Sequence, residues 1–233
     1  MQLSPLGDKP SSAAVAGAPD LEAVTVMDSD GTTVLLANEQ TCEVLEFDLE
    51  AAQLTGRSWA LDGLFPWDAK SGIEGMTFIP GDAFYGTAND SVSSEGHVVV
   101  CSQLDGNVYA LSLPGINTVN GTAVAAPSVV SHIETPLVRD CSGLFFEHTS
   151  GALYVLSDDS DRLYQYALPF GSAAIVADYE LPSYADQEGA YLLSINESDN
   201  LFIADDSGYL FRYFFPVRIS CFAERPRAVS YGR

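Results

Sequence analysis

The sequence predicts an all-β chain folded as a β-propeller of four-stranded antiparallel blades. The same succession of a small-residue segment, an aliphatic segment, an acidic turn and an aromatic-rich segment can be read four times. Each segment is short, apolar and bounded by turn residues, as expected of strands in a meander. Repeats at intervals of about 45 to 70 residues are typical of propeller blades. A chain of 233 residues with 47% hydrophobic and 11% aromatic residues can also bury a sizeable core.

The third repeat shows the expected strands most clearly. Its segments are Cys141-Ser-Gly-Leu-Phe-Phe-Glu, Ala152–Leu156, the turn Ser157–Asp161, Arg162–Leu168 and Ala174–Leu181. The four blades are expected at about 21–62, 73–134, 140–181 and 187–222, within a propeller region of 21–216. Alternating burial along such strands predicts a set of apolar residues between neighbouring blades. The set consists of Phe78, Leu144, Val155, Leu192 and Ile203.

The two ends of the chain differ from the middle. Residues 1–20 are rich in Ala, Pro, Ser and Gly and predict a flexible lead-in. Residues 217–233 predict an outer strand, Val217–Phe222, and a basic tail, or alternatively an altered or truncated terminus where a further blade begins. The first ten residues lack both a basic start and a long apolar run, so we expect either a cytosolic protein or a chain that begins after its targeting segment. No apolar stretch is long enough to predict a membrane span.

The charge of the chain restricts its partners. Thirty-two acidic residues against ten Lys and Arg give a net charge of -22, which makes nucleic acid and anionic membranes poor partners. This excess of acid indicates either a solvated acidic surface or cation binding.

Several reactive residue types give only weak functional signals. The four cysteines have no Cys-x-x-Cys spacing, so they predict neither a zinc site nor a redox motif. Cys101 and Cys141 lie in apolar strand sequence, and we expect both to be buried thiols. His148 follows an inner strand and could reach the rim of the channel, or lie in a solvated turn. The long loop 81–96 could carry binding residues, or be an insertion without function.

The strongest functional signal is a repeated acid at the start of the inner strands. The first strand of each propeller blade lines the central channel. The repeated element reads Glu22-Ala23, Glu74-Gly75, Ser142-Gly143 and Glu188-Gly189. Glycine suits the crowded hub, whereas three carboxylates near one axis repel each other unless a cation compensates them.

These oxygen ligands favour calcium or magnesium over zinc or copper. Asp140 and Asp186, just before their inner strands, could add ligands at the same end of the channel. The predicted metal ligands are therefore Glu22, Glu74, Glu188, Asp140 and Asp186. The alternative is that these acids accept backbone N–H bonds at blade junctions and hold no metal.

The motifs of the third and fourth repeats resemble those of the SdiA-regulated family of β-propeller proteins. The matching segments are Asp140-Cys-Ser-Gly-Leu-Phe-Phe-Glu, Gly151-Ala-Leu-Tyr-Val-Leu-Ser-Asp-Asp, Asp186-Gln-Glu-Gly-Ala and Leu201-Phe-Ile-Ala-Asp-Asp. The resemblance is good over residues 130–215 and looser over 21–113. The sequence departs from the family pattern at Cys141, at Ala23 and after Phe215.

The resemblance implies an extracytoplasmic or secreted propeller that can hold calcium and that has more than four blades, so we expect an incomplete ring here. Related propellers include phytase-like, esterase-like and lactonase-like enzymes. Calcium-dependent lactonase relatives use a hub glutamate as a metal ligand, at the position of Glu74 and Glu188 here. Fold alone does not transmit activity.

Three functions remain open from the sequence. The first is a calcium-supported binding module that takes a small-molecule or protein ligand at the channel face. The second is a metal-dependent hydrolase of esters, lactones or phosphoesters, and the third is a non-catalytic interaction scaffold. Phytate hydrolysis is disfavoured because the propeller region offers few basic residues for so anionic a substrate.

Overall fold

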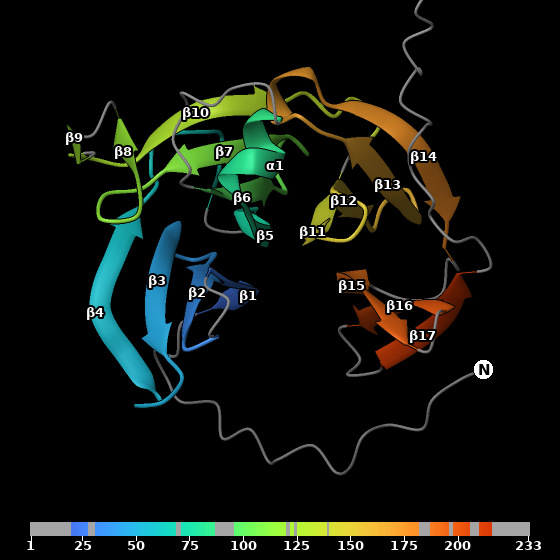
Figure 1. The fold of residues 1–233 in the computed structure, drawn as a ribbon, viewed down its shortest axis with the longest axis horizontal. Helices are drawn as coiled ribbons and strands as arrows, with labels where there is room; N and C mark the ends of the chain where they lie inside the picture. Colours follow the sequence, from blue (N-terminus) through green and yellow to red (C-terminus); the bar gives the residue numbers. More distant parts are fainter. Residues whose placement is uncertain are drawn as a thin grey trace, which may run out of the picture.

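The computed structural model describes residues 20–27, 31–68, 71–86, 96–119, 122–123, 125–138, 140–181, 187–195, 198–205 and 210–215. These residues form antiparallel sheets that stand around a central axis (Figure 1). The predicted all-β propeller of antiparallel blades is confirmed. The predicted lead-in before Asp20 and the predicted outer strand and tail at 217–233 lie outside the described residues.

The first two blades each contain four strands. Blade 1 has the order β1 (Leu21–Val26), β2 (Thr33–Asn38), β3 (Glu43–Asp48) and β4 (Gln53–Ala60). Blade 2 has the order β5 (Ile73–Ile79), β6 (His97–Ser102), β7 (Val108–Ser112) and β10 (Ser128–Ile133). The innermost strands, β1 and β5, begin where the repeats predicted.

The third and fourth blades follow the same plan. Blade 3 has the order β11 (Cys141–Glu147), β12 (Ala152–Ser157), β13 (Arg162–Ala167) and β14 (Ala174–Glu180). The described part of blade 4 contains β15 (Gln187–Ile195), β16 (Ser198–Asp205) and β17 (Leu210–Phe215). The first strand of each repeat, β1, β5, β11 or β15, is therefore the strand nearest the central axis (Figure 1).

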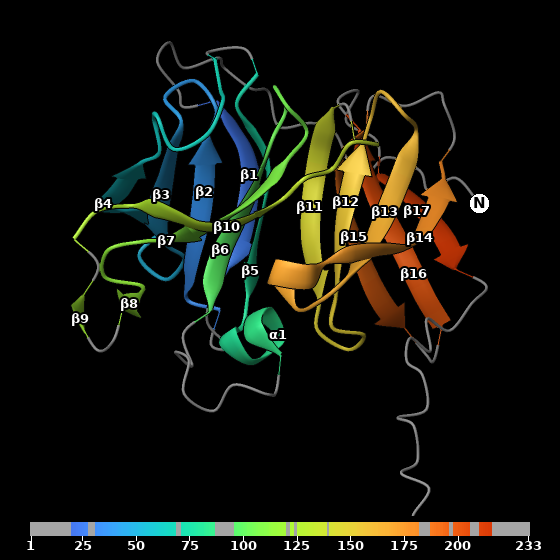
Figure 2. The ribbon, with the colours of Figure 1, turned by 90° about the horizontal axis from the view of Figure 1, so that it is seen from above.

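Short elements connect the strands. A small hairpin, β8 (Thr118–Val119) and β9 (Thr122–Ala123), precedes β10, and a 3-10 helix, η1 (Phe170–Ser172), precedes β14. The helix α1 (Gly81–Tyr85) lies at one end of the inner strands (Figure 2). The sequence predicted only a loop over 81–96, of which residues 87–95 lie outside the described part. Across the described residues, no helix combines the length and apolar character needed to cross a membrane.

Three apolar cores lie between successive blades. Leu35 and Val44 of blade 1 pack with Val98 and Val100 of blade 2. A second core joins blades 2 and 3, and a third joins blades 3 and 4. Of the residues predicted to lie between blades, Leu144, Val155, Leu192 and Ile203 are buried. Phe78 is only half-buried, because part of its side chain lines the channel.

A disulfide joins blades 2 and 3. Cys101 in β6 and Cys141 in β11 are bonded, with Cα atoms 6.1 Å apart. The prediction of two buried thiols was right about burial and wrong about the free state. Their 40-residue separation carries no pairing signal, because the two strands meet only through packing between blades.

The described sheets do not close into a ring. β1 packs on β5, β5 on β11, and β11 on β15, but no comparable packing joins β15 to β1, and a sector between blades 4 and 1 is open (Figure 1). Residues of blade 1 that alternate with its core residues face away from blade 2. Val24, Leu36 and Leu45 are cross-strand partners on that face and are half-buried or exposed. The expected incomplete ring is therefore present among the described residues.

Candidate functional site

A bulge at the same position in all four inner strands determines which side chains enter the channel. The register with the second strand shifts between residues 21 and 23, 73 and 75, 141 and 143, and 187 and 189. Each shift skips one residue of the inner strand, which is therefore not aligned in register with a residue of the second strand. These residues are Glu22, Glu74, Ser142 and Glu188. A bulge redirects a side chain, so it converts the sequence repeat into convergence on one axis.

The small residue after each bulge allows the inner strands to approach closely. A Cβ atom on Gly75 would lie 2.7 Å from the backbone nitrogen of Leu144. A Cβ atom on Gly143 would lie 3.3 Å from the Cα atom of Gly189. In both cases the close atom belongs to the next blade. The predicted role of the glycines at a crowded hub therefore agrees with the structure.

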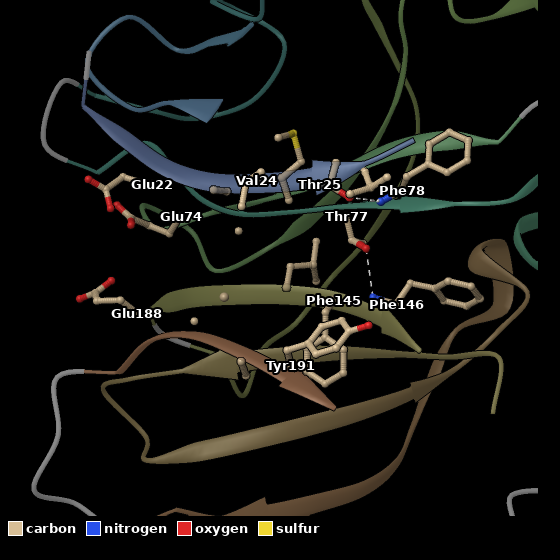
Figure 3. A pocket seen from close by; sticks show the side chains of 18 of the residues that line it. Glu22, Val24, Thr25, Glu74, Thr77, Phe78, Phe145, Phe146, Glu188 and Tyr191 are labelled. Atoms are coloured by element: carbon tan, nitrogen blue, oxygen red, sulfur yellow. Dashed lines mark hydrogen bonds between the residues drawn. The ribbon is translucent and has the colours of Figure 1, made fainter. Parts of the chain in front are cut away.

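Three of the five predicted metal ligands lie together at one end of the channel. One carboxylate oxygen from each of Glu22, Glu74 and Glu188 lies within 4.8 Å of the other two (Figure 3). Oxygens bound to one calcium ion at about 2.4 Å can lie at most about 4.8 Å apart. Glu74 is buried and the other two are half-buried. The geometry therefore fits a single shared cation reached from the channel.

A further acid, Glu39, supports this group and was missed by sequence reasoning. It follows β2, and Glu22 forms a second close group with Glu39 and Asp20. Glu39 Oε1 accepts a hydrogen bond from the Gly72 backbone N–H at 3.0 Å. A Cβ atom on Gly72 would lie 2.6 Å from Glu39 Cγ, so only glycine leaves room there. Glu39 belongs to no repeated motif, and its only sequence signal is its place at the end of the second strand.

The carboxylates change the acidity of Glu74. Burial, followed by the charge of Glu39 and a hydrogen bond between the two side chains, raises the pKa of Glu74 to about 9. The charges of Glu22 and Glu188 are smaller contributions to the same rise. Glu74 therefore favours its protonated form at neutral pH unless a cation compensates the neighbouring charges.

The other two predicted ligands are not part of this group. Asp140 lies apart from it, near Gln103, Asp158 and Asp159. Burial, and then these two aspartates, raise the pKa of Asp140, while a hydrogen bond from Gln103 opposes the rise. Asp186 lies outside the described residues.

The neighbouring turn shows that the alternative role for acids at blade junctions also occurs. Asp158 Oδ1 accepts a hydrogen bond from the Gln187 backbone N–H at 2.8 Å. The Glu39 carboxylate makes the same kind of contact at the junction of blades 1 and 2. Acids that follow the second strand of a blade thus accept backbone hydrogen bonds from the next blade. The glutamates at the bulges instead enter the channel.

A cavity of about 460 Å³ extends from the carboxylates along the channel. Its walls come from the inner strands of all four blades, and the exposed His148 is part of its lining. In Figure 3, Glu22, Glu74 and Glu188 lie at one end, and aromatic side chains including Phe145 and Tyr191 lie farther along. The cavity therefore combines an acidic end with an apolar body.

Threonine hydroxyls join successive inner strands along this cavity. Thr25 Oγ1 accepts a hydrogen bond from the Phe78 N–H at 3.1 Å, and Thr77 Oγ1 accepts one from the Phe146 N–H at 3.0 Å (Figure 3). The equivalent residue of β11 is Phe145, which stacks on Tyr154 instead. Threonine hydroxyls thus join blades 1, 2 and 3 at the hub, whereas Phe145 stacks on a side chain of its own blade.

The comparisons with known proteins bear on the fold alone. No protein-family model matches the chain, and no curated protein matches it. The resemblance to the SdiA-regulated family therefore stays a prediction from the motifs. The chain is similar to the β-propeller domain of Cps50 from Myceliophteria thermophila, at 12% identity and a TM-score of 0.46, over 82% of this chain and 52% of that one.

Two further solved structures are similar at the same level. A streptogramin B lyase has 15% identity and a TM-score of 0.46, over 87% of this chain and 57% of that one. The WD40 domain of SCAP from fission yeast has 16% identity and a TM-score of 0.43, over 84% of this chain and 42% of that one. The chain thus spans about half the length of these structures.

Proposed function

We propose that the chain is a calcium-supported propeller module that binds a ligand in its central channel. The observation that carries this proposal is the convergence of Glu22, Glu74 and Glu188, from three blades, within 4.8 Å of one another. Glu39 is a positioning residue, because it contacts both Gly72 and Glu74.

The donor set supports calcium. All three ligands are carboxylates, which suit hard cations and offer neither the imidazole nor the thiolate that zinc or copper prefers. Calcium accepts six to eight oxygens in irregular geometry, so three carboxylates leave positions for water or for a ligand oxygen. The half-buried Glu22 and Glu188 keep that side open to the channel.

The buried hydroxyl of Ser142 at the hub also supports the presence of a bound ion or water. Ser142 occupies the bulge of blade 3, where the other blades carry glutamate. The residue is 3% exposed, and Oγ has no hydrogen-bond partner among the described residues. Buried hydroxyls are normally satisfied by protein, water or an ion. Bound at the hub, calcium would supply positive charge and coordination positions for oxygen.

A second candidate function is metal-dependent hydrolysis of an uncharged ester or lactone. The observation that favours it is the cavity that adjoins the carboxylates, because a substrate carbonyl held there would face the cation. Calcium-dependent turnover of an ester, abolished by EDTA, would distinguish this function from simple binding.

The disulfide supports an extracytoplasmic location for the protein. Disulfides persist in oxidising compartments and are rare in the cytosol, and this one joins two blades within a buried core. This location agrees with the implication of the SdiA-regulated motifs.

Calcium titration of EDTA-treated protein tests the proposal. A ligand that binds only the folded state at 100 times its Kd stabilises it by about 2.7 kcal/mol, which raises Tm by about 5 to 10 °C for a chain of this size. The response should be larger at pH 8 than at pH 6, because calcium must displace the proton of Glu74.

Paired substitutions provide the control. The double variant Glu74→Gln, Glu188→Gln should lose the calcium response. Glu50→Gln, Glu134→Gln makes the same charge change at exposed positions and should keep it. A full response in the first variant would assign these glutamates a structural role only.

A further inference from the structure

We infer that the channel ligand is a small uncharged molecule with an aryl or alkyl body and one oxygen donor, and that the site rejects anions. The inference rests on the proposed calcium site and adds the chemical class of the ligand. It is drawn from the distribution of polar groups, apolar wall and charge along the cavity.

The cavity has the size of a small-molecule site. Its volume of about 460 Å³ lies within the range of roughly 300 to 1,000 Å³ that is usual for such sites. Val24 and Tyr191 line it and are 62% and 57% exposed. Because both retain such exposure, a small molecule can reach this part of the wall from solvent.

Beyond the carboxylates, the wall is mostly apolar. Val24, Met76, Leu144 and Ala190 occupy equivalent positions two residues after the bulges and line the cavity. Such a surface favours an alkyl or aryl body, because contact removes apolar area from water.

Aromatic side chains continue this wall on the side of blades 3 and 4. The rings of Phe145 and Tyr191 have centroids 6.2 Å apart. Together they present faces and edges suitable for contact with an aryl group.

The threonine hydroxyls along the wall are already engaged. The hydroxyl oxygens of Thr25 and Thr77 accept backbone N–H bonds. A ligand with many hydroxyl groups would lose its bonds to water along this wall without equivalent replacement. The ligand is therefore expected to be polar only at the end that meets the cation.

The charge at the acidic end of the cavity determines whether the polar group of the ligand is neutral or charged. The carboxyl groups gathered there belong to Asp20, Glu22, Glu39, Glu74 and Glu188. One divalent cation does not balance so many acids, so a ligand carboxylate or phosphate would add repulsion. A carbonyl or ether oxygen can complete the coordination of calcium without adding charge.

Three probes with the same body test the inference: methyl 4-phenylbutanoate, 4-phenylbutanoate and 4-phenylbutylamine. Calcium-loaded protein should bind the ester at least about tenfold more tightly than the acid in calorimetric titrations, and EDTA should weaken ester binding. Equal or tighter binding of the acid would overturn the inference. An amine that displaces calcium and binds more tightly than the ester would also overturn it, because the site would then select cations.

Variants in the wall identify where the probe binds. Tyr191→Ser removes an exposed ring and adds no charge, and it should weaken ester binding at least about fivefold. Leu137→Ser changes an equally exposed side chain, 57% accessible, outside the cavity lining and should leave ester binding unchanged. Equal ester affinity in the two variants would place the probe elsewhere and contradict the inference.

The calcium titration separates the two proposals. Wild-type protein that shows no calcium response refutes the proposed function itself. A normal calcium response without preference for the ester refutes only the ligand class, and ester binding that is equal with calcium and with EDTA does the same.

Discussion

Replacing Glu74 with glutamine removes a buried acid whose protonation is linked to folding. Glu74 lies beside Glu39, Glu22 and Glu188, so in the absence of a cation it favours the protonated form. Glutamine has nearly the same shape and is neutral at every pH. In EDTA, we expect Glu74→Gln to be about as stable as the wild type at pH 5 and more stable at pH 8.

The size of the effect follows from the two pKa values of Glu74. The unfolded chain releases this proton near pH 4.5, whereas the folded protein holds it up to about pH 9. Between these values the folded state binds the additional proton, so the free energy of unfolding falls by about 1.4 kcal/mol per pH unit. The stabilisation is fully present below pH 4.5 and is lost as the pH rises through 9. From pH 5 to pH 8, the variant should gain about 4 kcal/mol over the wild type.

Urea unfolding in EDTA at pH 5, 6, 7 and 8 measures this difference. The wild-type and Glu74→Gln curves should diverge with rising pH, while Glu50→Gln, at an exposed position, should remain parallel to the wild type. A constant difference between wild type and Glu74→Gln across this range would show that the buried acid does not control stability. Saturating calcium should remove most of the divergence, because the cation stabilises ionised Glu74.

Three further predictions concern contacts between blades. Thr77→Val removes the acceptor for the Phe146 N–H and should cost about 1 to 3 kcal/mol in urea unfolding. Gly75→Ala should cost at least about 1 kcal/mol by overpacking, whereas Gly171→Ala, with nothing within 4 Å of the added Cβ atom, should be tolerated. Reducing the disulfide that encloses 40 residues should cost about 4 kcal/mol, and an unchanged Tm in reductant would contradict its stabilising role.

The sequence predicted the blades well because a repeat is a local pattern with a direct structural meaning. The inner strands begin at Leu21, Ile73, Cys141 and Gln187, at or next to the predicted positions. Contacts between blades left much weaker signals. The disulfide depends on the packing of β6 against β11, which no spacing between two cysteines reveals.

The candidate site was predictable in part for a related reason. The Glu-Gly repeat marks the bulge, so Glu22, Glu74 and Glu188 could be identified from the sequence. Asp140 has a similar sequence position but precedes the bulge, and it lies beside Gln103 rather than with the three glutamates. Glu39 reaches Glu74 through the fold, from the end of a different strand.

The helix α1 shows a limit of periodic patterns. Its five residues, Gly81–Tyr85, are too few to display a helical repeat of apolar positions. Its buried Phe84 packs against Phe170, with ring centroids 4.9 Å apart. The tertiary contact with the segment before β14 therefore supports a helix that local sequence does not predict.

Serine at the bulge of blade 3 explains why the acidic end is asymmetric. Glutamates from blades 1, 2 and 4 enter the channel, but blade 3 supplies Ser142, whose buried hydroxyl adds no charge. A fourth glutamate would increase the repulsion that already raises the pKa of Glu74. With three carboxylates at the bulges instead of four, the proposed calcium site carries less negative charge and keeps coordination positions for another oxygen. Under the proposed function, serine in place of a fourth glutamate therefore leaves a coordination position for a ligand oxygen.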